Sequence, residues 1–153
     1  MINDAPACSI RSVVISVRDL DRSTTFYQDV MNVSEVIRQD KLAVLGGEVT
    51  GPFTLFLRQA NRNAIRVGQE ALGIRALSCD VEAFAELDRV EGRLRAFNAF
   101  RDRQFLDEAE EFEIVRGYDP DRLPLSFVAY ETRNRIALND YHRALAGMYT
   151  VDL

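Results

Sequence analysis

Two stretches of the chain repeat one order of apolar and polar residues. In residues 13–28 (VVISVRDLDRSTTFYQ), an apolar run over 13–17 is followed by an acidic turn and then by Phe26 and Tyr27. A short apolar run predicts a buried strand, and the residues after the turn have the spacing of a helix. Residues 76–87 (ALSCDVEAFAEL) repeat the order of strand, aspartate and helix. The repetition predicts a duplicated module.

Three further strands are predicted in the first module, over residues 33–38, 42–45 and 53–58. Within the third, alternation places Thr54, Phe56 and Arg58 on the face opposite to the leucines. The helix before these strands needs a capping residue, for which Asp19 and Asp21 are both candidates.

The second module follows a polar stretch, residues 61–73, that we interpret as a linker. A strand is predicted over 74–79, and Asp80 is then placed to cap a helix. The helix is indicated by apolar residues spaced three or four apart: Phe84, Leu87, Val90 and Leu94.

The end of the chain is less regular. Residues 97–111 show no clear period, and we expect the three phenylalanines among them to be buried. Two more strands are predicted, over 112–116 and 125–130, separated by a turn around Pro120. An apolar stripe predicts a helical tail over residues 134–150.

Composition narrows the class of protein. The 153 residues suit a single domain, 1–153, and 47% hydrophobic with 28% charged residues is typical of a globular chain. The net charge of −5 disfavours binding to nucleic acid or to an anionic membrane. No apolar run approaches the ~20 residues of a membrane span, and the first dozen residues lack a secretory pattern. Cys8 and Cys79 have no metal-type spacing, so we expect reduced thiols and a cytoplasmic location.

Together these patterns resemble one family. V-x-D-L-x-x-S-x-x-F-Y-x-D-V at 17–30, its echo at 76–87 and DPD at 119–121 are similar to the vicinal-oxygen-chelate superfamily. This superfamily includes glyoxalase I, bleomycin-resistance proteins and extradiol dioxygenases. The length of the chain fits one pair of modules, whereas ring-cleaving dioxygenases built from two pairs fit poorly.

The resemblance implies an α+β fold of two tandem βαβββ modules, with curled mixed sheets that enclose a cavity and helices on their outer faces. The modules would span about residues 10–60 and 73–130, followed by the helical tail. It also implies a homodimer, to which the tail could contribute by packing on the partner chain.

Metal-using members of this family hold the ion with a His early in each module and a Glu on each module's last strand. The matching positions here are Ser12, Phe56, Ile74 and Ser126. None is a normal ligand for a divalent metal, so we expect no metal at the family position and no cofactor. The alternative is a relocated Zn, Ni, Mn or Fe site, for which the candidate residues are Glu48, Glu131 and His142.

Other side chains have both a functional and a structural interpretation. An inward Arg58 would offer a guanidinium fork to a carboxylate or phosphate, whereas a solvent position at the strand end is the simpler view. The single histidine, His142, is more typical of a structural residue than of an acid or base. The glutamates at 108, 110, 111 and 113 are more typical of a solvated face than of a cation site. The predicted ligand-binding set is Ser12, Val14, Phe56, Arg58, Ile74, Ser126 and Tyr130.

Three functions remain open. The first is a protein that binds a small organic molecule in the sheet cavity without the metal, as in drug sequestration. The second is a glyoxalase-type lyase or isomerase, or a dioxygenase, with relocated ligands. The third is an interaction module whose cavity is filled by Phe56 and Ile74.

Overall fold

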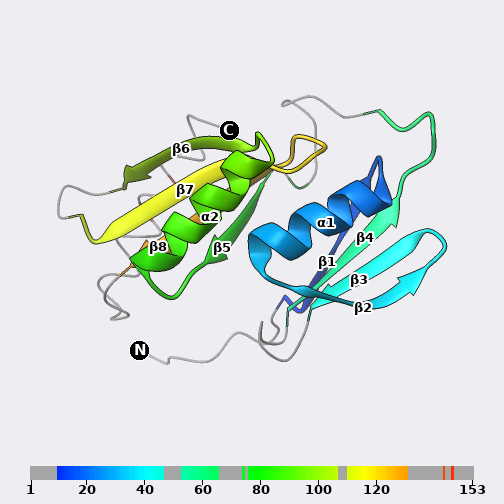
Figure 1. Cartoon of the computed structure of the whole chain (residues 1–153), viewed down its shortest axis with the longest axis horizontal. Helices are drawn as coiled ribbons and strands as arrows, with labels where there is room; N and C mark the ends of the chain where they lie inside the picture. Colours follow the sequence, from blue (N-terminus) through cyan, green and yellow to red (C-terminus); the bar gives the residue numbers. More distant parts are fainter. Residues whose placement is uncertain are drawn as a thin grey trace. The chain divides into compact units, whose positions relative to one another are not determined.

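The computed structural model describes residues 10–46, 53–65, 74, 76–106, 110–130, 143 and 146. Contacts divide the chain into two compact units, Met1–Ala64 and Ile65–Leu153. In the described ranges, each unit contains one four-stranded sheet and one helix of 12 or 13 residues (Figure 1). The chain is therefore a tandem repeat of βαβββ modules in the α+β class, as the sequence predicts.

The first unit contains sheet A, in which the strands lie in the order β1-β4-β3-β2. Strands β1 and β4 are parallel, whereas the β4–β3 and β3–β2 pairs are antiparallel. The bounds of its elements are β1 Ser12–Val17, α1 Leu20–Met31, β2 Ser34–Gln39, β3 Leu42–Gly46 and β4 Thr54–Gln59.

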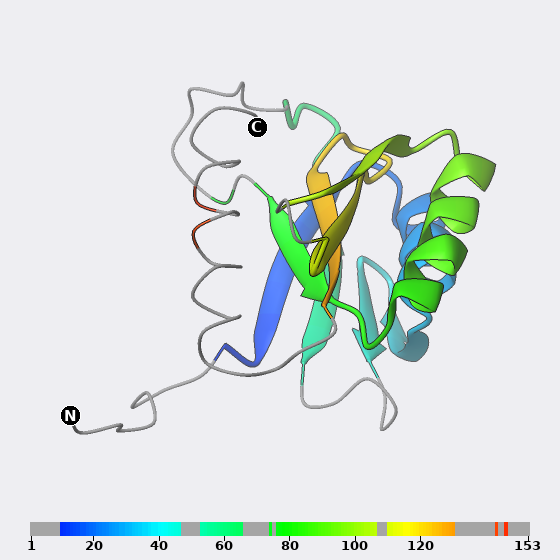
Figure 2. The ribbon, with the colours of Figure 1, turned by 90° about the vertical axis from the view of Figure 1, so that its left-hand side faces the viewer.

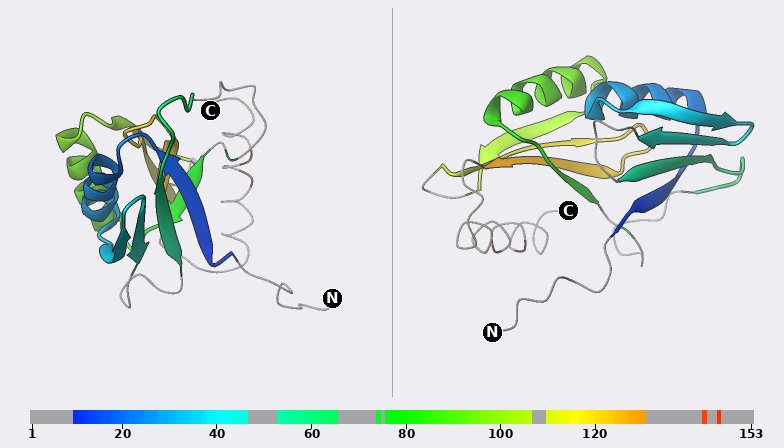
Figure 3. Two further views of the ribbon diagram at one scale, coloured as in Figure 1. Left: turned by 90° about the vertical axis from the view of Figure 1, so that its right-hand side faces the viewer. Right: turned by 90° about the horizontal axis from the view of Figure 1, so that it is seen from below.

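Helix α1 covers one face of sheet A (Figure 3). Asp19 caps its first turn, because a side-chain oxygen of Asp19 accepts a hydrogen bond from the Arg22 amide at 3.0 Å. Asn32 ends the helix in the left-handed conformation, with φ 54°. The buried side chains of the helix and of the strand faces beneath it are Leu20, Phe26, Tyr27, Val30, Ala43, Leu45, Leu55 and Leu57.

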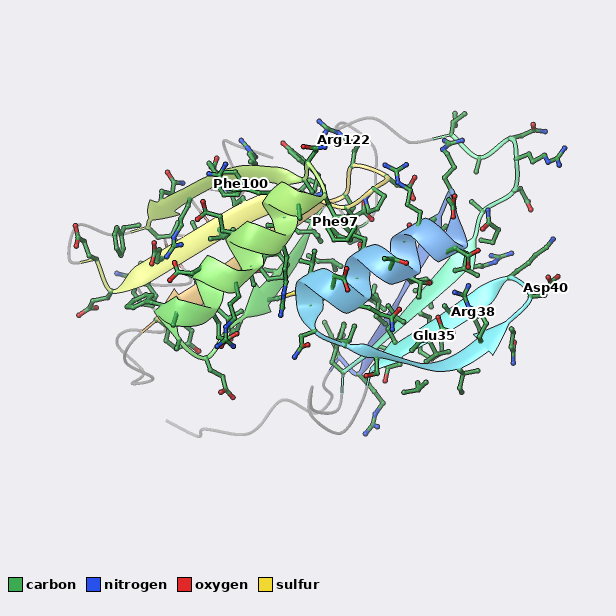
Figure 4. The ribbon with its side chains drawn as sticks, in the orientation of Figure 1. Glu35, Arg38, Asp40, Phe97, Phe100 and Arg122 are labelled. Carbon is green, nitrogen blue, oxygen red and sulfur yellow. The ribbon has the colours of Figure 1, made fainter. Side chains whose placement is uncertain are left out.

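An ion pair connects strand β2 to helix α1. The pairing of β2 with β3 shifts between Glu35 and Ile37, which indicates a β-bulge. Beyond the shift, Arg38 forms ion pairs of 3.1 Å with both Glu35 and Asp21, and Asp21 lies in the first turn of α1. Figure 4 shows Glu35 and Arg38 together on β2. Of these two ion pairs, Arg38–Asp21 links the outer strand to the helix, whereas Arg38–Glu35 lies within β2.

The second unit contains sheet B, with the strand order β5-β8-β7-β6. As in sheet A, the first and last strands of the module are parallel neighbours and the other pairs are antiparallel. Helix α2 packs on one face of this sheet (Figure 2). The bounds are β5 Leu77–Asp80, α2 Phe84–Ala96, β6 Phe100–Phe105, β7 Phe112–Tyr118 and β8 Pro124–Tyr130.

Helix α2 is held on sheet B by apolar and charged contacts. Leu87, Val90 and Leu94 are buried. Arg103 on β6 forms ion pairs with Asp88 and Glu91 of the helix and with Glu113 of β7. The hydrogen bond that Arg103 donates to the Glu113 carboxylate is the main reason that the pKa of Arg103 is raised above its ordinary value. The network therefore crosses three elements around one permanently charged side chain.

The structure corrects three expectations in the second module. Asp80 is not a helix cap: it is the last residue of β5, and the next amide still bonds to β8, since Val81 N donates to Val128 O at 2.9 Å. Helix α2 starts at Phe84 without a side-chain cap. Strand β6 was not predicted at all. Ile74 lies ahead of β5 and not within it.

The expectation of buried phenylalanines at 97–105 is also wrong. Phe97 and Phe105 are both more than a third exposed. Phe100 lies under the guanidinium of Arg95, 3.9 Å from its ring centroid, which is a cation–π contact. Figure 4 shows Phe97 and Phe100 near the end of α2. This region is a helix end followed by a charged strand, so it does not form a continuous apolar core.

No helix in the described ranges is long and apolar enough to cross a membrane. Of the predicted tail helix at 134–150, only Arg143 and Ala146 belong to the described residues, and both are helical.

Candidate functional site

The register of sheet A defines a face that points away from α1, here called the distal face of sheet A. Val14 pairs with Phe56, and Ser16 pairs with Arg58. Because side chains alternate along a strand, these four residues share the face with Ser12. This face is opposite to Leu55 and Leu57, which are buried on the side of α1.

The distal face of sheet A combines exposed polar and apolar side chains. Ser12, Ser16 and Arg58 are exposed, and Val14 is 60% exposed. Phe56 is half-buried. Exposed branched and aromatic side chains next to hydroxyls and a guanidinium are the ingredients of a small-molecule site.

Four residues of the predicted ligand-binding set thus lie side by side: Ser12, Val14, Phe56 and Arg58. Ser16 was missed, although the alternation that joins Ser12 to Val14 also includes it. Arg58 combines features of the two interpretations, a solvent position at the strand end and a position facing the ligand site. The residue lies near the strand end and is exposed, but its strand position is on the distal face with Phe56.

The distal face of sheet B, the face away from α2, carries a polar row across its four strands. Ser78 pairs with Ser126, Ser126 with Arg116, and Arg116 with Asp102. The guanidinium of Arg116 donates two hydrogen bonds to the Asp102 carboxylate, from Nε and Nη2, each 2.7 Å long. A bidentate pair of this kind fixes both the position and the plane of the arginine.

The two distal faces differ in burial. Ser126 is 3% exposed and Arg116 is 7% exposed, and their apolar neighbours Ile114 and Val128 are completely buried. On sheet A, by contrast, Val14 and the polar residues are accessible. Among the described residues, the polar side chains on the distal face of sheet A are therefore accessible, whereas sheet B holds an ion pair whose arginine is buried.

The remaining residues of the predicted ligand-binding set belong to the second unit. Ile74 is 67% exposed and precedes β5. Tyr130 ends β8, where its ring contacts that of Phe112 at a centroid distance of 5.9 Å. Whether Ile74, Ser126 or Tyr130 contacts a ligand stays a prediction. Glu48, Glu131 and His142 lie outside the described residues.

The donor chemistry at the family's metal positions does not suit a divalent ion. Ser12 and Ser126 offer neutral hydroxyls, and Phe56 and Ile74 offer no donor at all. In the described ranges, no group of three or more His, Cys, Asp or Glu side chains is arranged to hold a metal. Asp102, a carboxylate on the distal face of sheet B, is already bound to Arg116. The residues present do not fit the family metal.

Asp119 and Cys79 are two further groups in the second unit whose surroundings the structure describes. The buried carboxylate of Asp119 accepts hydrogen bonds of 2.8 Å from the amides of Asp121 and Leu123, so it builds the turn at 119–123. Cys79 lies on β5 opposite Phe127, which is buried. Burial, and to a lesser degree the charge of Asp80, raises the pKa of the Cys79 thiol to about 11.

The raised pKa predicts an unreactive Cys79. At pH 8 the thiolate fraction is roughly two orders of magnitude smaller than for an ordinary thiol, because the thiolate is the nucleophile and the usual pKa is about 8.5. We expect iodoacetamide to label Cys79 about a hundredfold more slowly in the folded protein than in urea, measured by peptide mass spectrometry. Equal rates in the two conditions would contradict this assignment.

The fold defines the class of protein. Tandem βαβββ modules with parallel outer pairs are the architecture of the vicinal-oxygen-chelate superfamily, and solved structures of this class match the chain, which confirms the predicted resemblance. A scan of the sequence against models of protein families gives no match. A search of curated protein sequences gives none either.

Three of the matching structures show the range of the class. The glyoxylase/bleomycin resistance protein/dioxygenase domain from Frankia sp. EAN1pec is 26% identical, with a TM-score of 0.68, and the match covers 81% of this chain and 98% of that one. Lactoylglutathione lyase from Agrobacterium tumefaciens is 21% identical, with a TM-score of 0.60 and coverages of 82% and 96%. The fosfomycin resistance protein FosX from Mesorhizobium loti is 17% identical, with a TM-score of 0.60 and coverages of 87% and 99%. The last two matches establish the fold alone.

Proposed function

We propose that this chain binds a small organic molecule on the distal face of sheet A, without the metal that other members of the superfamily use. One observation carries the proposal: Ser12, Val14, Phe56 and Arg58 gather on one accessible face. The mixture of apolar surface with a few polar groups is typical of ligand sites.

The donor chemistry supports the same conclusion. A metal-dependent glyoxalase or dioxygenase needs carboxylate or imidazole ligands to polarise its substrate. The family positions provide hydroxyl and hydrocarbon groups instead. The names of two matched structures refer to resistance to bleomycin and to fosfomycin, so this scaffold is associated with drug-like molecules. A relocated metal site is the competing proposal.

A ligand screen by thermal shift tests the proposal. A ligand present at about 100 times its Kd stabilises the folded state by ~2.7 kcal/mol, which raises Tm by roughly 5–11 °C for a chain of this size. Val14→Glu places a charge on the apolar part of the face, so we expect it to abolish the shift. Because Val14 is already 60% exposed, the substitution leaves the fold intact.

Ile65→Glu is the matched control, since Ile65 is 84% exposed and lies outside the distal face. It should leave the ligand-induced shift unchanged. Metal analysis of protein purified without chelator completes the test. Stoichiometric Zn, Ni, Mn or Fe, together with turnover of hemithioacetals or catechols, would overturn the proposal in favour of an enzyme. No stabilisation by any ligand would favour an interaction module.

A further inference from the structure

The two modules carry corresponding rows of residues on their distal faces. Ser16 in the segment Val-Ile-Ser-Val corresponds to Ser78 in Ala-Leu-Ser-Cys, and each lies on the strand before the helix. Each serine begins a row that crosses all four strands of its sheet. The rows are Ser16, Arg58, Leu42 and Gln39 in sheet A, and Ser78, Ser126, Arg116 and Asp102 in sheet B.

Both rows contain one arginine, but only one of them contains a carboxylate. In sheet B, Asp102 on the outer strand binds Arg116 through two parallel hydrogen bonds. In sheet A, the outer strand carries the neutral Gln39 at the equivalent place. Within the described part of the chain, Arg58 forms no ion pair or side-chain hydrogen bond. Among the described residues, Arg58 on β4 therefore has no carboxylate in its row, whereas Arg116 on β7 has Asp102.

The surroundings of Arg58 suit an external anion. Ser16 is its direct neighbour on β1, and Leu42 is its direct neighbour on β3. Ser16 can donate a hydrogen bond to an anion, and Leu42 offers an apolar side chain beside the guanidinium. Val14 and Phe56 lie one pair further along the same face, where they can hold an apolar group. A guanidinium next to a hydroxyl and an apolar surface matches a molecule with a carboxylate at one end and a hydrocarbon body.

We infer that the ligand of this protein is an organic acid whose carboxylate binds Arg58 and Ser16 and whose apolar part lies on Val14 and Phe56. The inference rests on the proposed function and names its ligand class. The carboxylate would take, in sheet A, the role that Asp102 has in sheet B. A phosphonate can also accept two parallel hydrogen bonds from the guanidinium, so the experiment tests a phosphonate separately.

The test compares small ligands that differ only in their polar group. Phenylacetate, phenylacetamide and benzylphosphonate are titrated into the full chain by calorimetry or NMR. We expect the carboxylate to bind at least tenfold more tightly than the amide. Arg58→Gln should weaken carboxylate binding at least tenfold and leave the weak amide binding unchanged, while Arg58→Lys should fall between the two proteins. Arg22→Gln on α1, also an exposed arginine, is the matched control and should bind like the wild type.

The possible results distinguish failure of the organic-acid inference from failure of the proposed binding function. Suppose that the acid and the amide bind equally well, that Arg58→Gln does not change either affinity, and that Val14→Glu abolishes both. This result would overturn the organic-acid assignment and leave the proposed binding function standing. Tighter binding of the phosphonate than of the carboxylate, dependent on Arg58, would overturn the carboxylate in favour of a phosphate-like group. Absence of binding by all three ligands and by every other ligand screened would overturn both proposals.

Discussion

Replacing Gly117 by alanine lowers the free energy of unfolding by roughly 2–4 kcal/mol, at or above the upper part of the usual range for overpacking. A Cβ atom at this position would lie 2.5 Å from the backbone oxygen of Ala99 and 3.0 Å from both methyl groups of Leu94. The Ala99 oxygen cannot move freely, because it accepts a hydrogen bond of 2.9 Å from the amide of Tyr118. The glycine therefore lets α2 and the start of β6 lie close to β7.

Urea unfolding followed by circular dichroism measures this effect, and the matching loss in Tm is roughly 5–15 °C. Gly92→Ala is the matched control. Gly92 lies within α2, and a Cβ there would have no heavy atom within 4 Å. Alanine in a helix interior stabilises by about 0.5–1 kcal/mol relative to glycine, so the control should shift the midpoint upward. If Gly117→Ala unfolded at the wild-type urea concentration, the close packing of α2 on β7 would be wrong.

Replacing Asp102 by alanine destabilises the protein by roughly 2–4 kcal/mol, because it leaves a charged arginine buried without its carboxylate. The side chain of Arg116 is 8% exposed and that of Asp102 is 36% exposed. Loss of the partner therefore costs more free energy for the buried arginine than for the partly exposed aspartate. We expect the double variant Asp102→Leu with Arg116→Met to recover part of the loss, since it removes both charges.

The double-mutant cycle is measured from urea unfolding midpoints of the wild type, the two single variants and the double variant. Arg89→Ala serves as a control for a surface ion pair. Arg89 contacts Glu86 at 2.8 Å, but both side chains are well exposed, so the loss should stay below about 1 kcal/mol. A loss from Asp102→Ala as small as that from Arg89→Ala would contradict the conclusion that the buried Arg116 needs the Asp102 carboxylate.

The apolar pattern predicted most of the fold because most strands bury one regular face. Alternation in β4 places Leu55 and Leu57 under α1, as predicted. Strand β6 escaped detection because its central residues, Arg101, Asp102 and Arg103, are charged. The partners of Asp102 and Arg103 come from β7 and α2, more than ten positions away for most of them. Pairing over such distances is invisible to a local pattern.

The candidate site was predicted to a similar extent. Alternation within β4 grouped Phe56 with Arg58, and the family resemblance added Ser12 and Val14. The register of the two parallel strands places these four residues on one face. The row of Arg116 and Asp102 could not be predicted, because it depends on β6 and on its bulged pairing with β7. The position of Ile74 was misjudged because its apolar side chain looked like part of the strand that starts at Leu77.

The unequal burial of the two distal faces has a consequence for how such a protein can evolve. Around Ser126 and Arg116, a new side chain must fit among neighbours that are already in contact, so most changes there affect folding. Around Val14, a new side chain meets solvent, so it can alter which molecule is recognised at little cost to the fold. Substitutions on the distal face of the second module are therefore constrained by packing, whereas substitutions around Val14 in the first module can change ligand specificity.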